Sequence, residues 1–213
     1  LLSWIPVATF FVSKEDYLFA NKYFLGKNNT RFYVANSASK LIFYPYTSEE
    51  KLKARKTYGI DSIAKVIGFV GRLVKEKGII ELLEAFNLIT HIIPDVNLLI
   101  CGERLDSDYQ DGVSRELKQY SLIHPGKIIC TGMLNDKRDL VDAYNCMDIF
   151  CLPSWREGLP TALIEAMMCS LPSVVSSVRG CTELIEDNYS GLIVPLKSPK
   201  EICSGIARMF LDN

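Results

Sequence analysis

From Lys65 to the end of the chain, short apolar segments alternate with helical ones, and this alternation constrains the fold more than any other feature. Short apolar runs bounded by Gly and Pro are typical of strands, and the longer periodic segments between them are typical of helices. The predicted strands cover residues 66–70, 96–101, 127–130, 148–152, 173–176 and 192–194. The predicted helices cover residues 79–91, 111–121, 137–145, 161–169, 182–186 and 200 onward. This series of β–α units predicts an α/β fold, a doubly wound, Rossmann-like parallel sheet with helices on both faces.

The order of the strands decides which loops of such a sheet meet. In the common order 3-2-1-4-5-6 the first and fourth strands are neighbours, and ligands bind outside their carboxyl ends. The loop after the first predicted strand is residues 71–78, and the turn after the fourth is residues 157–160. We therefore expect these two segments to face one crevice.

The region before the sheet has a different pattern. Residues 9–12 and 31–34 predict two strands, and residues 14–24 between them predict a helix. Ser13 is a suitable N-cap for this helix, with Asp16 at its third position.

A polar, weakly patterned stretch follows, with a short charged helix predicted at residues 49–58. We interpret this change of composition as a domain linker. The predicted domains are residues 1–45, the end of one domain plus the linker, and residues 46–213, a second domain truncated at its last helix. Because the chain starts at Leu1 and stops within a helical pattern, we expect it to be a piece of a longer polypeptide.

Composition narrows the class of protein. With 24 basic and 25 acidic residues, the net charge of -1 gives no reason to expect nucleic acid as a partner. The 7 cysteines include no C-x-x-C pair, so we expect reduced thiols in a cytoplasmic compartment, without a disulfide framework or zinc site. The apolar residues 1–12 are shorter than the about 20 needed to cross a bilayer, and we expect no transmembrane segment.

Two carboxylates flank the turn that leads from the fourth predicted strand into the next helix. Glu157 lies in the turn, Pro160 lies at the helix start, and Glu165 lies on the helix. A helix start presents unpaired N–H groups that suit an anion, whereas carboxylates would repel a phosphate. The two glutamates are suited to holding hydroxyl groups on either side of a phosphate. This pattern predicts a sugar–phosphate–nucleoside ligand; the alternative is that both are surface or capping carboxylates.

The loop after the first strand supplies positive charge to the same crevice. Gly71 allows close backbone approach, while Arg72 and Lys77 offer a planar fork and a point charge for phosphate oxygens. Elsewhere on the chain such residues would be solvated surface cations. Because we expect Arg72 and Lys77 to lie beside the turn at residues 157–160, we favour a role for them in binding. Trp155 and Arg156 are equally compatible with lining this pocket or with lying outside it.

Five blocks of sequence appear in a specific order. They are FVGRLVKEKG at 69–78, LVDAYNCMDIFCLPS at 140–154, EGLPTALIEA at 157–166, RGCTELI at 179–185 and SGLIV at 190–194. Together they resemble the C-terminal, donor-binding domain of family 4 retaining glycosyltransferases, which have the GT-B fold. The blocks are most similar to bacterial enzymes that build surface and capsular polysaccharides. Glu157 and Glu165 match the E-x7-E signature of that family.

The resemblance implies a role for each matching residue. Arg72 and Lys77 would neutralise the donor diphosphate, Glu157 would contact the donor sugar, and Glu165 would bind the ribose hydroxyls. Glu157, Arg72 and Lys77 would form the catalytic group. The implied donor-binding residues are Gly71, Arg72, Lys77, Glu157, Gly158, Leu159, Pro160, Thr161 and Glu165.

The resemblance also implies an activity. It is the transfer of a hexosyl group, with retention, from a UDP-linked donor to a glycan or lipid-linked acceptor. Residues 1–45 would then end the acceptor-side domain, and residues 46–213 would bind the nucleotide sugar without a metal or other cofactor. The expected location is the cytoplasm, at the inner face of the membrane.

Two departures from the family pattern leave an alternative open. Asn36, Ala38 and Lys40 stand within a segment where the family has a Gly-x-Gly-x-Asp turn, and Ser170 stands where it has Gly. These changes are also compatible with a non-catalytic nucleotide- or sugar-phosphate-binding module, or with an inactive, truncated relic.

Overall fold

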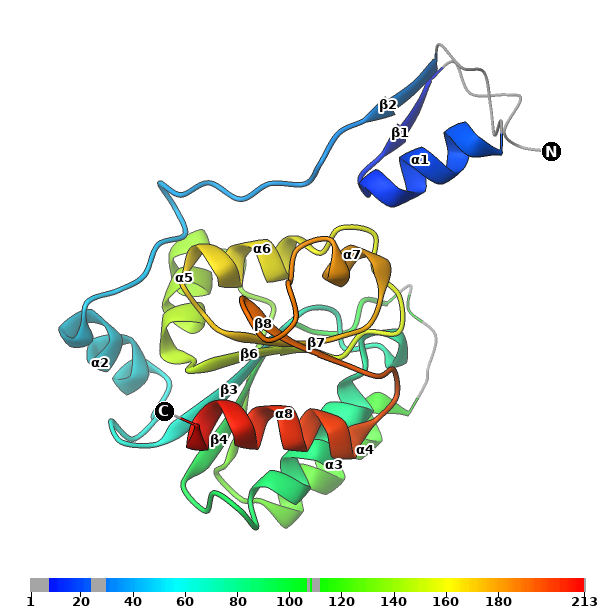
Figure 1. Cartoon of the computed structure of the whole chain (residues 1–213). Helices are drawn as coiled ribbons and strands as arrows, with labels where there is room; N and C mark the ends of the chain where they lie inside the picture. Colours follow the sequence, from blue (N-terminus) through cyan, green and yellow to red (C-terminus); the bar gives the residue numbers. More distant parts are fainter. Residues whose placement is uncertain (1–7, 24–29, 107, 109–111, 213) are drawn as a thin grey trace.

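The computed structural model of the chain describes residues 8–23, 30–106, 108 and 112–212, and its main body is a parallel six-stranded sheet (Figure 1). The order across this sheet is β5-β4-β3-β6-β7-β8. The strands are β3 (Lys65–Val70), β4 (Val96–Cys101), β5 (Ile128–Gly132), β6 (Ile149–Leu152), β7 (Ser173–Ser176) and β8 (Gly191–Val194). Counted from β3 this is the order 3-2-1-4-5-6, so the predicted doubly wound topology is confirmed.

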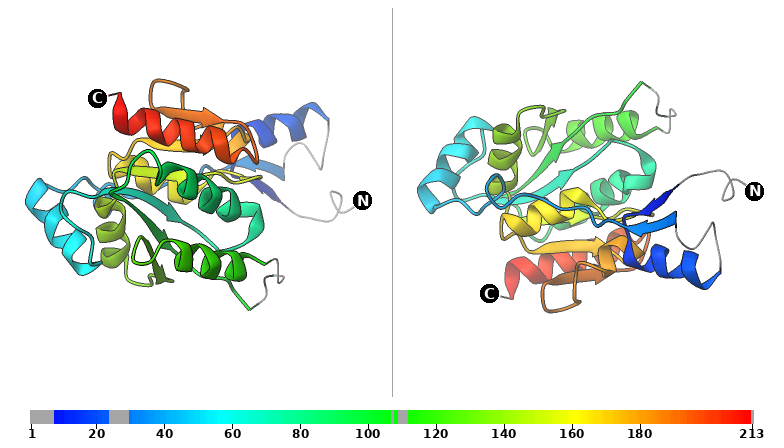
Figure 2. Two further views of the ribbon diagram at one scale, coloured as in Figure 1. Left: turned by 90° about the horizontal axis from the view of Figure 1, so that it is seen from below. Right: turned by 90° about the horizontal axis from the view of Figure 1, so that it is seen from above.

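Helices cover both faces of the sheet, as Figures 1 and 2 show. One layer contains α3 (Ile79–Ile89), α4 (Val113–Ile123) and α8 (Pro199–Leu211), and the other contains α5 (Lys137–Cys146), α6 (Thr161–Met168) and α7 (Arg179–Thr182). Every residue of β4 and β6 is buried, which explains why these strands are apolar apart from Asn97 instead of alternating.

The bounds of the predicted elements are close to those observed, except at α7. The sequence predicts a helix at residues 182–186, but the helix is Arg179–Thr182, so this prediction is wrong. Gly180 lies against the Gly158 carbonyl so closely that a Cβ at Gly180 would be 1.9 Å from its oxygen. This contact with a distant turn requires the chain to begin turning as soon as β7 ends.

A second, smaller unit precedes the sheet. Strands β1 (Thr9–Phe11) and β2 (Arg31–Tyr33) are parallel and flank α1 (Lys14–Lys22). Ser13 caps α1 by accepting a hydrogen bond from the Asp16 N–H at 3.2 Å, which confirms the predicted N-cap. The predicted last residue of this helix, Phe24, and the predicted start of α4 at Asp111 lie outside the described residues.

An extended linker runs from β2 across α6 to α2 (Ser48–Thr57), as seen in both figures. The buried Arg55 of α2 donates hydrogen bonds to the carbonyls of Ala64 and Cys146 and to Asp148. In the linker, Phe43 is buried and packs edge-on against Tyr144. The domain boundary at residue 45 stays a prediction.

Candidate functional site

The crevice of the sheet lies where β3 and β6 are neighbours, with Ile67 paired to Ile149. The loop after β3, which includes the 3-10 turn η3 (Lys75–Lys77), and the turn after β6 line one pocket of about 670 Å³. The pocket is lined by Asp16, Arg72, Val74, Lys75, Glu76, Lys77, Asp108, Trp155, Arg156, Glu157 and Gly158. The structure therefore brings together the two segments that the topology predicts to meet.

Lys77 and Glu157 form an ion pair at the centre of this crevice. The Lys77 Nζ lies 2.7 Å from one carboxylate oxygen of Glu157 and 2.9 Å from the other. The Ser154 hydroxyl donates to Glu157 at 2.6 Å, and only 8% of the Glu157 side chain is exposed. The carboxylate is thus held in one orientation by a cation from the opposite loop and by a hydroxyl of its own turn.

Gly78 allows the two loops to approach so closely. Its φ of 71° is left-handed, and a Cβ at this position would be 2.1 Å from the Pro153 carbonyl oxygen. Any side chain would therefore push η3 away from the β6–α6 turn. The backbone hydrogen bond from Trp155 N–H to the Glu76 carbonyl, 2.8 Å long, closes the same contact.

Arg72 lies at the edge of the pocket. Its guanidinium is half-exposed and pairs with Asp108 at 2.6 Å. Sequence reasoning missed Asp108, because no motif links the segment after β4 to the loop after β3. Gly71 does not line the main pocket; it lines a neighbouring cavity of about 230 Å³, which Arg72 also reaches.

The start of α6 follows closely in the chain on the turn that lines the crevice. Pro160 is the N-cap residue, and no side chain caps the helix. Gly158 lines the pocket, Leu159 and Pro160 are buried, and Thr161 is exposed. Because a helix leaves its first N–H groups without intrahelical partners, this end of α6 is suited to an anion.

Glu165 lies apart from the pocket that contains Glu157. Its carboxylate accepts a hydrogen bond from the Tyr144 hydroxyl of α5 at 2.8 Å, and it does not line the pocket. Burial raises the pKa of Glu165, and the hydrogen bond from Tyr144 partly opposes that rise. The two glutamates of one sequence signature therefore have different electrostatic surroundings.

Asn36 connects the linker to the site. Its side-chain amide donates to the Leu159 carbonyl at 2.6 Å, so this altered segment contacts the α6 turn. Ser170 adopts the left-handed conformation, with a φ of 58°, that the family pattern assigns to Gly.

The remaining candidates separate into two groups. Trp155 and Arg156 both line the crevice pocket. His91 and His124 do not line it, and His124 is hydrogen-bonded to Asn87 at 2.9 Å with its pKa lowered by burial. The structure therefore gives neither histidine a place in the crevice.

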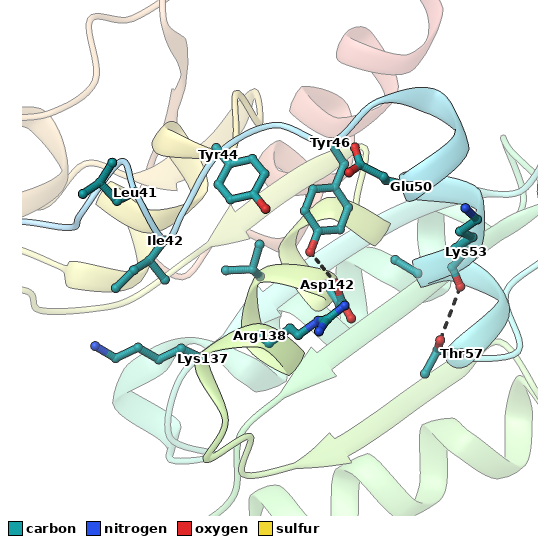
Figure 3. Close-up of a pocket in the computed structure, with 12 residues that line it drawn as sticks. Leu41, Ile42, Tyr44, Tyr46, Glu50, Lys53, Thr57, Lys137, Arg138 and Asp142 are labelled. Atoms are coloured by element: carbon teal, nitrogen blue, oxygen red, sulfur yellow. Dashed lines mark hydrogen bonds between the residues drawn. The ribbon is translucent and has the colours of Figure 1, made fainter.

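A separate pocket of about 540 Å³ lies between the linker, α2 and α5 (Figure 3). In it the Tyr46 hydroxyl donates to Asp142 at 2.5 Å, with Arg138 beside them. None of the predicted donor residues lines this pocket, and we assign it no role.

Across the described part of the chain, no cluster of three or more His, Cys, Asp or Glu side chains could hold a metal ion. No described helix combines the length and the apolar character needed to cross a bilayer. All seven cysteines are free thiols; six are buried and Cys130 is exposed.

Comparison with known proteins identifies the family. The family described as "Glycosyl transferases group 1" matches residues 50–213. An uncharacterised glycosyltransferase of Methanocaldococcus jannaschii is 33% identical over 164 residues, which are 77% of this chain and 40% of that protein. The capsular polysaccharide biosynthesis glycosyltransferase CapM of Staphylococcus aureus is 29% identical over 148 residues, 70% of this chain and 37% of that protein. The chain thus spans about two fifths of the length of these relatives, 40% and 37%.

Solved structures show the same fold. The crystal structure of HepE from Anabaena with UDP-glucose superposes with a TM-score of 0.85 at 20% identity, covering 99% of this chain and 56% of that one. The C-terminal domain of the group 1 glycosyltransferase LpcC from Francisella tularensis has a TM-score of 0.68 at 25% identity, covering 83% and 89%. The family match over residues 50–213 favours the enzyme family over the alternative of a non-catalytic module. The six-stranded sheet with its crevice at β3 and β6, and the match over residues 50–213, show that this chain belongs to the group 1 glycosyltransferases.

Proposed function

We propose that this chain is the donor-binding part of a family 4 retaining hexosyltransferase that uses a UDP-linked sugar. The observation that carries this proposal is the Lys77–Glu157 pair beside the start of α6. The pair brings a cation and a carboxylate together in one pocket, and the unpaired N–H groups at the start of α6 follow closely in the chain. A nucleoside-diphosphate sugar presents the matching groups, namely phosphate oxygens and sugar hydroxyls. HepE, whose structure this chain resembles, was crystallised with UDP-glucose.

In this proposal the ligand changes the partner of Lys77. Without ligand, the charge of Lys77 is balanced by Glu157. A diphosphate in the crevice binds Lys77 and Arg72, and Glu157 then accepts hydrogen bonds from hydroxyls of the donor sugar. The N–H groups of Gly158, Leu159 and Thr161 contact the sugar and the phosphate. Glu165 of α6, which Tyr144 holds, binds the ribose hydroxyls.

These groups also suit the chemical step. As the bond between the anomeric carbon and the leaving oxygen loosens, negative charge grows on the diphosphate. Arg72, Lys77 and the start of α6 stabilise this charge in a partly buried pocket, where such interactions are stronger than in water. Because these groups supply the positive charge, we propose that transfer proceeds without a metal ion, with retention at the anomeric carbon. Activity of the full-length enzyme should then be unchanged by a chelator.

The acceptor belongs to the other domain. We propose that a glycan or a lipid-linked glycan binds the acceptor-side domain, of which residues 1–45 are the end. CapM, which this chain resembles, is named for capsular polysaccharide biosynthesis. The free thiols fit a cytoplasmic protein, and a lipid-linked acceptor places the enzyme at the inner face of the membrane.

Calorimetric titration of the chain with UDP, GDP, ADP and UDP-glucose tests the proposal. We expect UDP and UDP-glucose to bind, and Lys77→Ala to weaken both about 10-fold or more, because a hydrogen bond to a charged group contributes about 1.5–3 kcal/mol. Lys53→Ala is the matched control, since Lys53 is exposed on α2 away from the crevice. A folded sample that gives no binding heat with any of the nucleotides would contradict the proposal.

A further inference from the structure

Trp155 is hydrogen-bonded to the loop after β3 by its backbone, and to the first turn of α3 by its side chain. Its backbone N–H donates to the Glu76 carbonyl at 2.8 Å, and its indole Nε1–H donates to Glu81 Oε1 at 3.0 Å. Glu76 directly precedes Lys77, and Trp155 lies two residues before Glu157. The backbone hydrogen bond therefore joins the same two segments as the Lys77–Glu157 pair, and the indole hydrogen bond joins the turn that carries Glu157 to α3, which directly follows the loop.

The side chain of Glu81 is buried, and its burial lowers the stability of the fold. The residue is 9% exposed in the first turn of α3, and its Oε2 has no hydrogen-bond partner among the described residues. A buried carboxylate oxygen without a partner carries a desolvation penalty that no local contact offsets. Such a group calls for an explanation beyond stability. The hydrogen bond from Trp155 is the contact that explains its orientation.

The ring of Trp155 forms part of the pocket wall and attracts cations. It lines the crevice, with the Lys197 Nζ 3.8 Å and the Lys75 Nζ 5.8 Å from its centroid. An indole ring attracts cations by its quadrupole, so the orientation of the ring also affects where these lysines lie. Glu81 sets that orientation through the indole N–H.

The loop after β3 depends on hydrogen bonds to other segments because the interactions within the loop hold it only weakly. The 3-10 turn η3 has 3 residues, and no side chain caps it at Val74. Short 3-10 turns have poor hydrogen-bond geometry and move easily unless other segments hold them. Lys77 is the last residue of this turn, so its place relative to Glu157 depends on what holds η3 against the β6–α6 turn.

We propose that Glu81 and Trp155 are positioning residues that hold Lys77 and Glu157 in the geometry that binds the donor diphosphate and sugar. This inference rests on the proposed function. Glu81 acts through Trp155, and Trp155 acts through the turn that carries Glu157. The pair lowers the cost of ordering the crevice when the ligand enters, which is a gain in affinity by preorganisation.

Calorimetry of the chain with UDP-glucose, using variants that keep or remove the hydrogen bond, tests the pair. Trp155→Phe keeps a ring and removes the donor, Glu81→Leu removes the acceptor, and Glu81→Gln keeps an oxygen in the same place. We expect the first two to weaken binding about 10-fold, because the ligand must then order a looser crevice when it binds, and Glu81→Gln to stay within about threefold of the unchanged chain. The double variant Trp155→Phe/Glu81→Leu should bind no more weakly than the weaker single variant.

Glu84→Leu is the matched control, because Glu84 is an exposed carboxylate three residues further along α3. Circular dichroism of each variant, at a temperature well below its melting point, separates positioning from stability. A merely structural role would lower the melting temperature and leave the affinity of the folded protein unchanged. If Trp155→Phe does not fold, the contrast between Glu81→Leu and Glu81→Gln decides.

Equal affinity of Glu81→Leu and the unchanged chain would overturn the positioning role and leave the proposed function intact. Additive losses in the double variant would also overturn it, since they would mean that the two side chains act separately. A different result is an unchanged chain that binds neither UDP nor UDP-glucose. It would contradict the proposed function, and with it the positioning role of Glu81 and Trp155.

Discussion

At the scale of single residues, the partner of a side chain decides its properties more than its place in a motif. Glu157 and Glu165 belong to one signature, yet Glu157 is paired with the Lys77 cation and Glu165 with the neutral Tyr144 hydroxyl. Both partners come from other parts of the chain. The spacing of the two glutamates therefore predicts that both belong to the site, but it does not predict which side chain each of them contacts.

Binding of UDP-glucose should weaken at acid pH because of Glu165. Burial raises the pKa of this carboxyl above its usual 4.5, so it gains a proton early as the pH falls. Ribose hydroxyls donate hydrogen bonds to the ionised form, so the bound state lowers this pKa. Affinity is then full above the raised pKa of the free protein and falls as the pH drops through it. Calorimetric titrations with UDP-glucose at a series of acid pH values measure this fall in affinity.

Glu165→Gln should bind more weakly at neutral pH but lose this part of the pH dependence. UDP-glucose is the right ligand, because it lacks the terminal phosphate group that titrates near pH 6. The effect of Glu165 on folding stability has the opposite sign. Because its pKa is higher in the folded chain than in the unfolded chain, this carboxyl stabilises the fold below about pH 4.5, and the stabilisation is lost as the pH rises through the folded-state pKa. Identical affinity profiles for Glu165→Gln and the unchanged chain would contradict the ribose role.

Ser170→Gly should stabilise the chain. Ser170 is exposed after α6 with a φ of 58°, a conformation that costs an L-residue about 1–2 kcal/mol and costs Gly almost nothing. After the greater chain entropy of Gly in the unfolded state is subtracted, we expect a gain of about 0.5–1 kcal/mol in urea denaturation. Ser204→Gly, at an exposed site inside α8, is the control and should lose about 0.5 kcal/mol. Equal changes in the free energy of unfolding for Ser170→Gly and Ser204→Gly would exclude the explanation by the left-handed backbone of Ser170.

At the scale of elements, one helix outside the alternating pattern holds the starts of two central strands. Arg55 of α2 donates to Asp148, which directly precedes β6, while Asp148 also accepts from the N–H of Val66 in β3. The ion pair is 2.7 Å long, and 6% of the Arg55 side chain is exposed. β3 and β6 are the two strands whose opposite ends carry the site. The charged helix α2 is therefore part of the sheet's framework.

Arg55→Met should destabilise the chain by about 3 kcal/mol, because removing one partner of a buried ion pair leaves the other uncompensated. The value is at the low end of the usual range because Lys51 also pairs with Asp148 at 2.8 Å. Urea denaturation measures the change. Lys53→Met is the control; its exposed pair with Glu49 should contribute less than about 0.5 kcal/mol. A loss below about 1 kcal/mol for Arg55→Met, roughly a fivefold change in the folding equilibrium, would contradict the framework role.

At the scale of the whole molecule, Glu183 connects the N-terminal unit to the sheet domain. Its carboxylate accepts a hydrogen bond from the Ser13 hydroxyl, and from the N–H groups of Lys14 at 3.0 Å and Glu15 at 3.2 Å. A carboxylate from one unit thus binds the N-terminus of α1 in the other, beside α7 (Figure 1). These hydrogen bonds lower the pKa of Glu183 despite its partial burial. The first turn of α1 also carries Asp16, which lines the crevice pocket.

Glu183→Ala should loosen the N-terminal unit and expose the linker at residues 34–43. Limited proteolysis, followed by mass spectrometry, should show faster cleavage in this segment. Because the folded pKa of Glu183 is lowered, the contact is complete above the ordinary value of 4.5 and weakens as the pH falls through the lowered pKa. Glu186→Ala, an exposed carboxylate after α7, is the control and should leave the cleavage rate unchanged. Equal rates for the two variants would contradict the connection through Glu183.

Local sequence patterns are enough to predict the class of fold and the segments that form the crevice. Periodicity is local, so the apolar runs at 96–101 and 148–152 predict buried strands without knowledge of any partner. The connection rules for parallel sheets then predict that the loop carrying Lys77 meets the turn carrying Glu157. The Ser13 cap is equally local and is predictable for the same reason.

The contacts between side chains across those segments depend on tertiary packing. Asp108 pairs with Arg72, Glu81 holds Trp155, and α7 begins at Arg179 because Gly180 packs against Gly158. Each of these contacts joins residues far apart in the chain. Their geometry is set by how closely two backbones approach, and hydrophobic periodicity carries no information about that distance. The sequence therefore predicts where the site lies, and packing between distant segments determines how its charges are balanced.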